Sequence, residues 1–289
     1  MKPAWYRSTD APSFPKRSLR GFERFAVRLM HGLNTNAGIK DLGYPFMWYA
    51  VHGYVNLCAG RLYEPHHLER VHQLKAPKGL ILVSNHRSFF DMYVTSDLLY
   101  GQAPHLMRRL FFPVRKDFFY DSPLGLFLNL TVSGGSMWPP IWRDERRREL
   151  NPVGFEQIAA VLDEGTVIGI HPEGKRSTLE DPWTQLDAKP GLGRLLRVCD
   201  PEVVVLPYFV LGLSNDVRVL ISRNFRAPGQ RGEPVRIRFG QPLKAGELLE
   251  QATGPDPLEI SAPVMQEIAR LAEEDRLDWQ ARPPEARIC

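Results

Sequence analysis

Short apolar runs alternate with helical patterns along most of this chain. Residues 80–83 form an unbroken apolar run that stops at Ser84, which is typical of a strand buried on both faces. The other strand-like segments are residues 166–170, 203–210, 217–222 and 234–239. Helical spacing, with Pro or Ser near the start or Gly at the end, marks the segment after Ser88 and residues 152–162, 192–198 and 263–279.

This alternation of strands and helices predicts an α/β fold with a mixed, largely parallel central sheet flanked by helices. The last strand alternates apolar residues, Val235, Ile237 and Phe239, with polar ones. We therefore expect it at an edge of the sheet, with one face in water.

The first 62 residues have a different pattern. Residues 1–18 are polar and contain three prolines, which indicates a flexible basic arm. Residues 19–31 carry apolar side chains at helical spacing and arginines on another face, so this segment can lie in a lipid headgroup layer. Residues 42–59 are apolar and aromatic but interrupted by Gly and Pro. We predict an N-terminal amphipathic helical hairpin for membrane association over residues 19–62 and an α/β domain over residues 63–289; a pair of core helices is the alternative for the hairpin.

The charge of the chain is concentrated at its start. The net charge is +4, and the first 30 residues hold seven basic residues against two acidic ones. This local basicity favours an anionic membrane surface, and we expect membrane lipids rather than nucleic acid as partners. The N-terminus is charged and broken by proline, so the sequence predicts no signal peptide.

No cysteine or histidine cluster has the spacing of a metal site. The candidates are Cys58, Cys199, Cys289, His66, His67 and His72. The cysteines are odd in number and lack a C-x-x-C pair, which predicts no disulfide framework and fits a reducing compartment. The histidines have no Cys or carboxylate at ligand spacing, so we predict no metal.

His86 lies in the turn between the buried strand and the helix that Ser88 can cap. Residues five apart point in different directions on a straight helix, so His86 and Asp91 meet only if His86 folds back over the first turn. There the carboxylate could fix the imidazole tautomer and leave a free nitrogen as a base. On spacing alone, the alternative is an Asp that caps the helix beside an unrelated histidine.

A second polar turn follows the strand at residues 166–170, at the place where open α/β sheets bind ligands. Residues 169–175 fit the G-x-x-x-x-G-K pattern of a phosphate-binding loop. However, Arg176 stands where a Ser or Thr must hold magnesium, and Glu173 would repel the phosphates. The pattern therefore argues against a nucleoside triphosphate site.

Four blocks of sequence, in this order, together resemble the glycerolipid acyltransferase family, which includes the lysophosphatidic acid acyltransferases. They are the H-x4-D block at residues 85–91, a Gly-to-Arg loop ending at Arg143, the P-E-G-x-R-S block at residues 172–177 and the apolar-Pro block at residues 203–207. The resemblance spans about residues 79–242. The chain departs from the family pattern at Lys175 (usually Thr), at His171 (usually Phe) and in the longer, Pro-rich loop before Arg143.

The resemblance implies an O-acyltransferase of phospholipid biosynthesis. It would move a fatty acyl group from acyl-CoA or acyl-carrier protein, without a cofactor, to a hydroxyl of a lysophospholipid or glycerol phosphate. His86 would be the catalytic base and Asp91 would orient it, while Pro207 belongs to a block implied to bind the acyl donor. The implied acceptor-binding residues are Arg143, Glu173, Gly174, Lys175, Arg176 and Ser177.

Such an enzyme would lie on the cytoplasmic face of a membrane, as a peripheral or monotopic protein. Two alternatives stay open: a non-catalytic lipid-binding protein of the same fold, and an acyltransferase for a lipid acceptor without phosphate. A hydrolase is disfavoured because the chain has no G-x-S-x-G turn.

Overall fold

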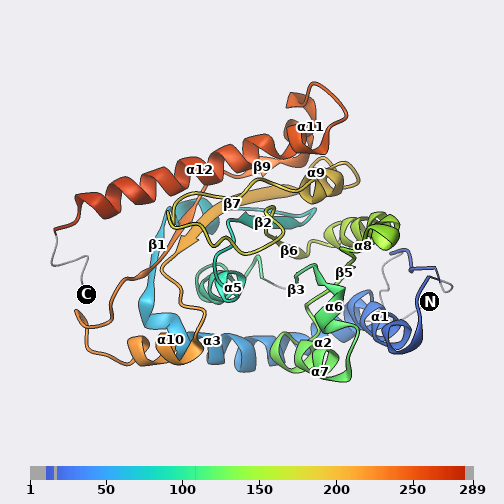
Figure 1. Ribbon diagram of the computed structural model, residues 1–289, viewed down its shortest axis with the longest axis horizontal. Coiled ribbons are helices and arrows are strands. Elements are labelled where there is room, and N and C mark those ends of the chain that lie inside the picture. The colour runs from blue at the N-terminus through green and yellow to red at the C-terminus, as the bar shows by residue number, and fades with distance from the viewer. Residues whose placement is uncertain (1–10, 16–17, 108, 284–289) are drawn as a thin grey trace.

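The computed structural model describes residues 11–15, 18–107 and 109–283 of the chain, and Figure 1 shows how they are arranged. A seven-stranded sheet has the order β1, β8, β7, β2, β6, β3, with β9 paired to β7. All its pairings are parallel except β7 with β8 and β7 with β9. The predicted α/β fold with a mixed, largely parallel sheet is confirmed.

The strands are short. Those of the main sheet are β1 Tyr63–His66, β2 Leu80–Ser84, β3 Leu110–Phe111, β6 Val167–Ile170, β7 Val204–Leu211, β8 Val235–Phe239 and β9 Leu243–Lys244. A separate parallel pair consists of β4 Val114–Arg115 and β5 Pro140–Ile141.

Helices cover both faces of the sheet (Figure 1). The first half of the chain forms α1 Gly21–Asn34, α2 Ala37–Phe46, the π-helical η1 Met47–His52, α3 Gly53–Ala59, the 3-10 turn η2 Gly60–Leu62, α4 Glu69–His72, α5 Asp91–Gln102, α6 Lys116–Phe119 and α7 Pro123–Val132. The second half forms the 3-10 segment η3 Glu145–Leu150, α8 Asn151–Leu162, α9 Gly191–Leu196, α10 Val217–Asn224, α11 Ala245–Gln251 and α12 Pro257–Ala281.

The central strand β2 divides the core. Ile81 and Val83 pack with α8, α9 and α12, whereas Leu80 and Leu82 pack with α3 and α5 on the other face. All five residues of β2 are buried, as the unbroken apolar run predicts.

The register of β2 places the two polar turns together. Val83 pairs with Ile170 of the parallel strand β6, so Ser84 and His171 leave the sheet side by side. Carboxyl ends of parallel strands meet at one edge of a sheet, which is the usual ligand-binding edge of this architecture.

Two predicted strands differ from the structure. Residues 217–222 lie in helix α10, because the Asp216 side chain accepts a hydrogen bond from Arg218 N (2.9 Å) and caps a helix there. The predicted edge strand is β8, which lies inside the sheet because β1 pairs with its outer side. Its polar residues Arg236 and Arg238 are buried rather than facing water.

The N-terminal helices belong to the same core as the sheet. Ala26, Val27 and Met30 of α1 pack in the cluster that contains Ile81 and Val83. This packing favours the core-helix alternative for the inner side of residues 19–62. The predicted boundary between a hairpin and an α/β domain at residue 62 stays a prediction. No helix in the described part of the chain is both long and apolar enough to span a bilayer.

Most of the predicted flexible arm, residues 1–10 and 16–17, lies outside the described residues. The part that is described contacts the domain. Phe14 is buried with its ring 4.8 Å from that of Trp142, and Pro12 O accepts a hydrogen bond from Gln157 Nε2 (2.7 Å).

Candidate active site

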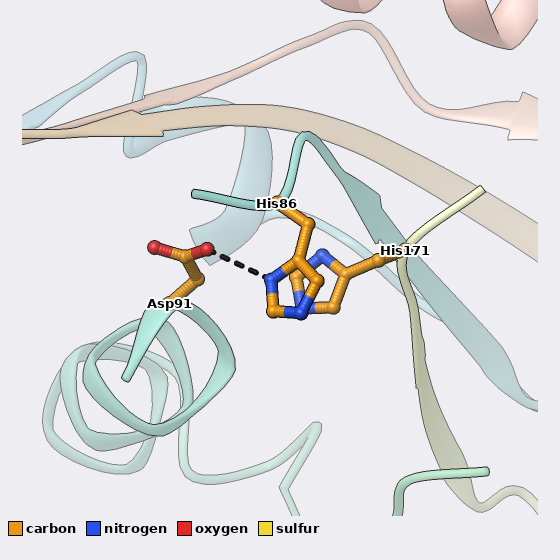
Figure 2. A group of neighbouring side chains, drawn as sticks. All are labelled: His86, Asp91 and His171. Carbon is orange, nitrogen blue, oxygen red and sulfur yellow. Dashed lines mark hydrogen bonds and ion pairs between the residues drawn. The ribbon is translucent and has the colours of Figure 1, made fainter. Parts of the chain in front are cut away.

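His86 and Asp91 meet as the spacing predicts. His86 follows the end of β2, and Asp91 is the first residue of α5, with 3.1 Å between His86 Nδ1 and Asp91 Oδ2 (Figure 2). The same oxygen accepts hydrogen bonds from the backbone N–H groups of Arg87 (2.7 Å) and Ser88 (2.8 Å). A carboxylate with these donors makes Nδ1 the protonated nitrogen of His86, so its Nε2 carries the free lone pair.

Asn85 attaches the His86 turn to the neighbouring strand. Its side-chain amide donates to Val210 O and accepts from Val210 N, both at 2.9 Å, and it is buried. This two-bond bridge to β7 holds the backbone from which His86 projects.

His171 is a site residue that the sequence reasoning did not assign. Its ring stacks on that of His86, with centroids 4.0 Å apart and planes 7° from parallel (Figure 2). Its Nδ1 lies 3.2 Å from Ser84 Oγ. The register gave only part of the signal. Val83 pairs with Ile170, so the residues that follow these two parallel strands lie close together, but the stacking of His171 on His86 depends on the path of the His86 turn.

His86, Asp91 and His171 bring potential metal-ligand atoms within 4.8 Å of one another. However, an imidazole binds a metal through a lone pair in the plane of its ring, and the two rings are stacked in nearly parallel planes. Their lone pairs therefore do not converge on one point, and Asp91 Oδ2 is already occupied by three donors. The geometry does not fit a metal ion at this group.

Glu173 and Ser177 both contact the backbone of His86. Glu173 is buried and its carboxylate accepts from His86 N and Leu186 N, both at 3.3 Å. Ser177 N donates to His86 O at 2.7 Å. These hydrogen bonds position the His86 backbone, and the predicted contact of Glu173 and Ser177 with an acceptor stays a prediction.

The exposed part of the second turn is cationic. Gly174, Lys175 and Arg176 are exposed, and the Arg143 guanidinium donates to Gly174 O. Arg176 Nη1 donates to Asn215 Oδ1 at 3.2 Å, and the same oxygen accepts from Phe89 N at 3.1 Å. Asn215, which the sequence reasoning missed, thus ties Arg176 to the turn that carries His86.

Burial and nearby charges determine the protonation states. Burial, with the charges of Arg176 and Arg143, lowers the pKa of His86 from 6.5 to about 4. Burial raises the pKa of Asp91 to about 6, although the backbone donors of Ser88 and Arg87 oppose the shift. At neutral pH the pair is therefore a neutral imidazole and a carboxylate, as a general base requires.

Pro207 lies inside the sheet. It occupies the middle of β7, pairs in register with Val83 and is buried, and its carbonyl accepts from Gly240 N at 2.8 Å. Pro207 is thus part of the strand itself. Its contact with an acyl donor stays a prediction.

An apolar cavity of about 320 Å³ opens beside the site. Its walls come from α3, the first turns of α5, the end of α7 and the start of α10. Phe89 and Phe90, which line it, lie in the turn between His86 and Asp91. The turn that carries His86 therefore also supplies one wall of the cavity.

Residues 65–210, just over half of the chain, match the family model described as acyltransferase. The chain belongs to the acyltransferase family. This match includes both polar turns and confirms the resemblance seen in the motifs.

A solved structure is also similar to this acyltransferase. It is the 1-acyl-sn-glycerophosphate (LPA) acyltransferase PlsC from Thermotoga maritima, with 16% sequence identity, a TM-score of 0.46 and coverage of 90% of this chain and 99% of that chain. No curated protein matches the chain in sequence.

Proposed function

We propose that this acyltransferase moves a fatty acyl group from acyl-CoA or acyl-carrier protein to a hydroxyl of a lysophospholipid or glycerol phosphate. One observation carries the proposal: a neutral imidazole, held by a buried carboxylate, lies near exposed arginines and on the same turn as two side chains that line an apolar cavity. These three parts correspond to a base, an anchor for a phosphate and a slot for a chain.

His86 acts as the general base. Its Nε2 takes the proton of the acceptor hydroxyl while the oxygen attacks the thioester carbonyl, and the imidazolium that forms is stabilised by Asp91. The tetrahedral intermediate then expels the thiolate, which receives the proton from His86. The products are an ester and a free thiol, and no cofactor takes part.

The cationic turn anchors the acceptor phosphate. Arginine binds phosphate through paired N–H donors, and Arg176 and Arg143 are near enough to His86 to lower its pKa. Lys175 and the backbone of Gly174 add donors on the same exposed turn. A phosphate held here brings a neighbouring hydroxyl towards the imidazole.

The apolar cavity takes the acyl chain. Its walls are aliphatic and aromatic side chains, with Phe89, Phe90 and Tyr93 on the side of α5. Burial of methylene groups in such a slot stabilises binding by about 0.8 kcal/mol for each group. The chain's thioester end would then lie at the turn that carries His86.

We also propose that α1 to α3 attach the protein to the cytoplasmic face of a membrane, as a peripheral or monotopic protein. In support, Arg20, Arg24 and Arg28 are exposed on α1 or at its start, and Leu42 and Tyr49 expose 81% and 79% of their surfaces. Exposed cations beside exposed apolar groups suit the headgroup layer.

Acyl transfer can be measured directly with the full-length protein. Labelled acyl-CoA and acyl-carrier protein are each offered with lysophosphatidic acid, glycerol 3-phosphate and a lysolipid that has no phosphate, and products are identified by mass spectrometry. We expect an ester product only with phosphate-bearing acceptors, and none with the His86→Ala variant.

The outcomes separate the alternatives. Transfer to the phosphate-free lysolipid at an equal rate would remove the proposed role of the arginines. Absence of transfer with every pair, together with saturable lipid binding, would support a non-catalytic lipid-binding protein of this fold.

A further inference from the structure

Two stretches of the chain carry no Asp, Glu, Lys or Arg: residues 42–60 and residues 122–142. The first contains the end of α2, η1 and α3, and the second contains α7. They are separated by more than 60 residues in the sequence, yet residues of both line the same apolar cavity, namely Tyr54 and Val55 from α3 and Thr131 and Val132 from α7. Helix α10 also lines the cavity, through Val217 and Leu220, as does the start of α5.

These helices expose large apolar side chains outward. Leu42, Tyr49, Leu57, Leu124, Phe127 and Phe225 each expose between 54% and 81% of their surface. We call these six residues, on α2, η1, α3, α7 and the C-cap of α10, the apolar face. In Figure 1, helices α10, α3, α2 and α7 follow one long edge of the molecule, and α12 follows the opposite edge.

Elsewhere the described surface exposes few such groups. Outside the elements that carry the apolar face, the large apolar side chains exposed in the described ranges are Phe25, Phe89, Phe118, Leu179, Val198, Leu258 and Leu277. They are spread over α1, the turn before α5, α6, a loop, the second residue after α9 and two distant turns of α12. Contiguous exposed apolar surface on one side of a protein indicates a binding surface, whereas scattered groups need no explanation.

We propose that a lipid bilayer covers the apolar face, and that α7 and α10 of the catalytic domain enter it together with the N-terminal helices. The membrane surface is thus composite, and it surrounds the mouth of the acyl cavity. This inference deepens the proposed function and rests on it for the purpose of the surface, but the binding itself can be tested without any turnover.

Three observations favour lipid over a second copy of the chain as the occupant. Tyr54 and Val132 line the cavity and are also 55% and 41% exposed, so the cavity opens on this side and a chain can enter from the bilayer. Tyr49 and Tyr54 are the residue type that collects at membrane interfaces. Finally, Arg28 on α1 is an exposed cation that can meet headgroup phosphates, and Arg218 on α10 is 88% exposed although it pairs with Asp216 at 3.0 Å.

The composite surface has a consequence for how membrane binding should be tested. Removing α1 to α3 would open the core, because Ala26 and Met30 are buried in one cluster and Ala59 in the other. Substitutions on α7 avoid this problem, since Leu124 and Phe127 are exposed and do not line the cavity.

The experiment measures cosedimentation of the full-length protein with vesicles of phosphatidylcholine and phosphatidylglycerol. The test variant is Leu124→Glu with Phe127→Glu, and the matched control is Leu258→Glu with Leu277→Glu on α12, which has the same charge change at exposed positions. We expect the α7 variant to bind at least about tenfold more weakly, and the α12 variant to bind as the unsubstituted protein does. A Phe225→Glu variant should give a smaller loss.

Two further measurements keep the result interpretable. Thermal unfolding checks that each variant is folded, and transfer between short-chain soluble substrates without vesicles should be unchanged in the α7 variant. If the unsubstituted protein shows no transfer at all, the proposed function fails while the binding result stands.

Unchanged vesicle binding of the folded α7 variant, or an equal loss in the α12 variant, would overturn the composite surface. So would a change from dimer to monomer on substitution without any change in vesicle binding, because the apolar face would then be an interface between copies.

Discussion

The molecule contains two groups of buried charge that differ in how completely they are paired. One is the candidate active site at the ends of β2 and β6. The other lies between β8 and α12, where Arg236, Arg238 and Asp275 are all buried. Both would be costly without partners, since a charge is poorly solvated inside a protein.

The group between β8 and α12 is richly paired. Asp275 accepts from Nε of both Arg236 (3.0 Å) and Arg238 (2.9 Å) and from the indole of Trp183 (2.9 Å). Other guanidinium donors also reach carboxylates, with Arg236 Nη1 2.8 Å from Glu233 Oε1 and Arg238 Nη2 2.6 Å from Asp278 Oδ2. Among the described residues, Arg236 Nη2 is the donor of this group that is buried without a hydrogen-bond partner. This arrangement ties α12 to the sheet.

The candidate active site differs. The buried carboxylate of Asp91 is paired, but the imidazole that it holds keeps a free Nε2. Arg176 makes one hydrogen bond, to a neutral amide. The pKa values of His86 and Asp91 are shifted accordingly. In this molecule, charge that holds structure is largely neutralised locally, whereas the charge proposed to act on a substrate is left open.

The largest effect on activity is expected from removing the base. His86→Ala should lower kcat by roughly 10²–10⁴-fold, because a positioned general base contributes about that much. Its unfolding free energy should stay close to that of the unsubstituted protein, since His86 is partly exposed. Steady-state kinetics and denaturant unfolding measure the two quantities, and near-normal turnover would exclude His86 as the base.

The largest effect on stability is expected from the other group. Asp275→Ala leaves two buried arginines without their shared carboxylate and should cost about 3–5 kcal/mol of unfolding free energy. The control is Asp278→Ala, which removes a carboxylate that is 54% exposed and should cost less than about 1 kcal/mol. Equal losses of unfolding free energy for the two variants, measured by urea unfolding, would show that burial does not distinguish the two carboxylates.

A smaller effect is expected at the phosphate anchor. Arg176→Ala should raise the KM for a phosphate-bearing acceptor roughly tenfold, as the loss of one charged hydrogen-bonding group does, and should leave the KM for the thioester nearly unchanged. Arg176→Lys keeps the charge and should recover part of the loss. A rise of both KM values by the same factor would contradict a specific role in acceptor binding.

The smallest effect concerns pH. The reaction needs neutral His86, whose pKa is lowered from 6.5 to about 4, and charged Asp91, whose pKa is raised to about 6. We therefore expect kcat/KM to stay nearly level down to pH 6.5 and to decrease below it. Arg176→Ala removes a positive charge that opposes protonation of His86, so its acid limb should move to higher pH. An acid limb at or above 6.5 in the unsubstituted protein would conflict with the buried, cation-flanked imidazole.

The fold class, the His86–Asp91 pair and the polar turn beside it could be predicted from the sequence. The apolar run of β2, the five-residue step from His86 to Asp91 and the polar turn after β6 are local patterns, and local patterns determine which strand and turn form. Parallel pairing of two such strands then brings both turns to one edge.

Other features depended on pairings between distant segments. Residues 217–222 read as a strand by composition but form α10, and β8 reads as an edge strand because nothing in its own pattern shows that Tyr63–His66 will pair beside it. The arginines of β8 are buried only because Asp275, nearly 40 residues later, lies opposite them on α12.

The sequence by itself therefore determined the turn that joins His86 to Asp91 and the type of sheet, since both follow from spacing within a few residues. Only the tertiary structure decided that His171 stacks on His86, that Asn215 holds Arg176, and that α3, α7 and α10 enclose one cavity. The physical reason is that contacts between distant segments depend on how the whole chain packs, which no short window of residues contains.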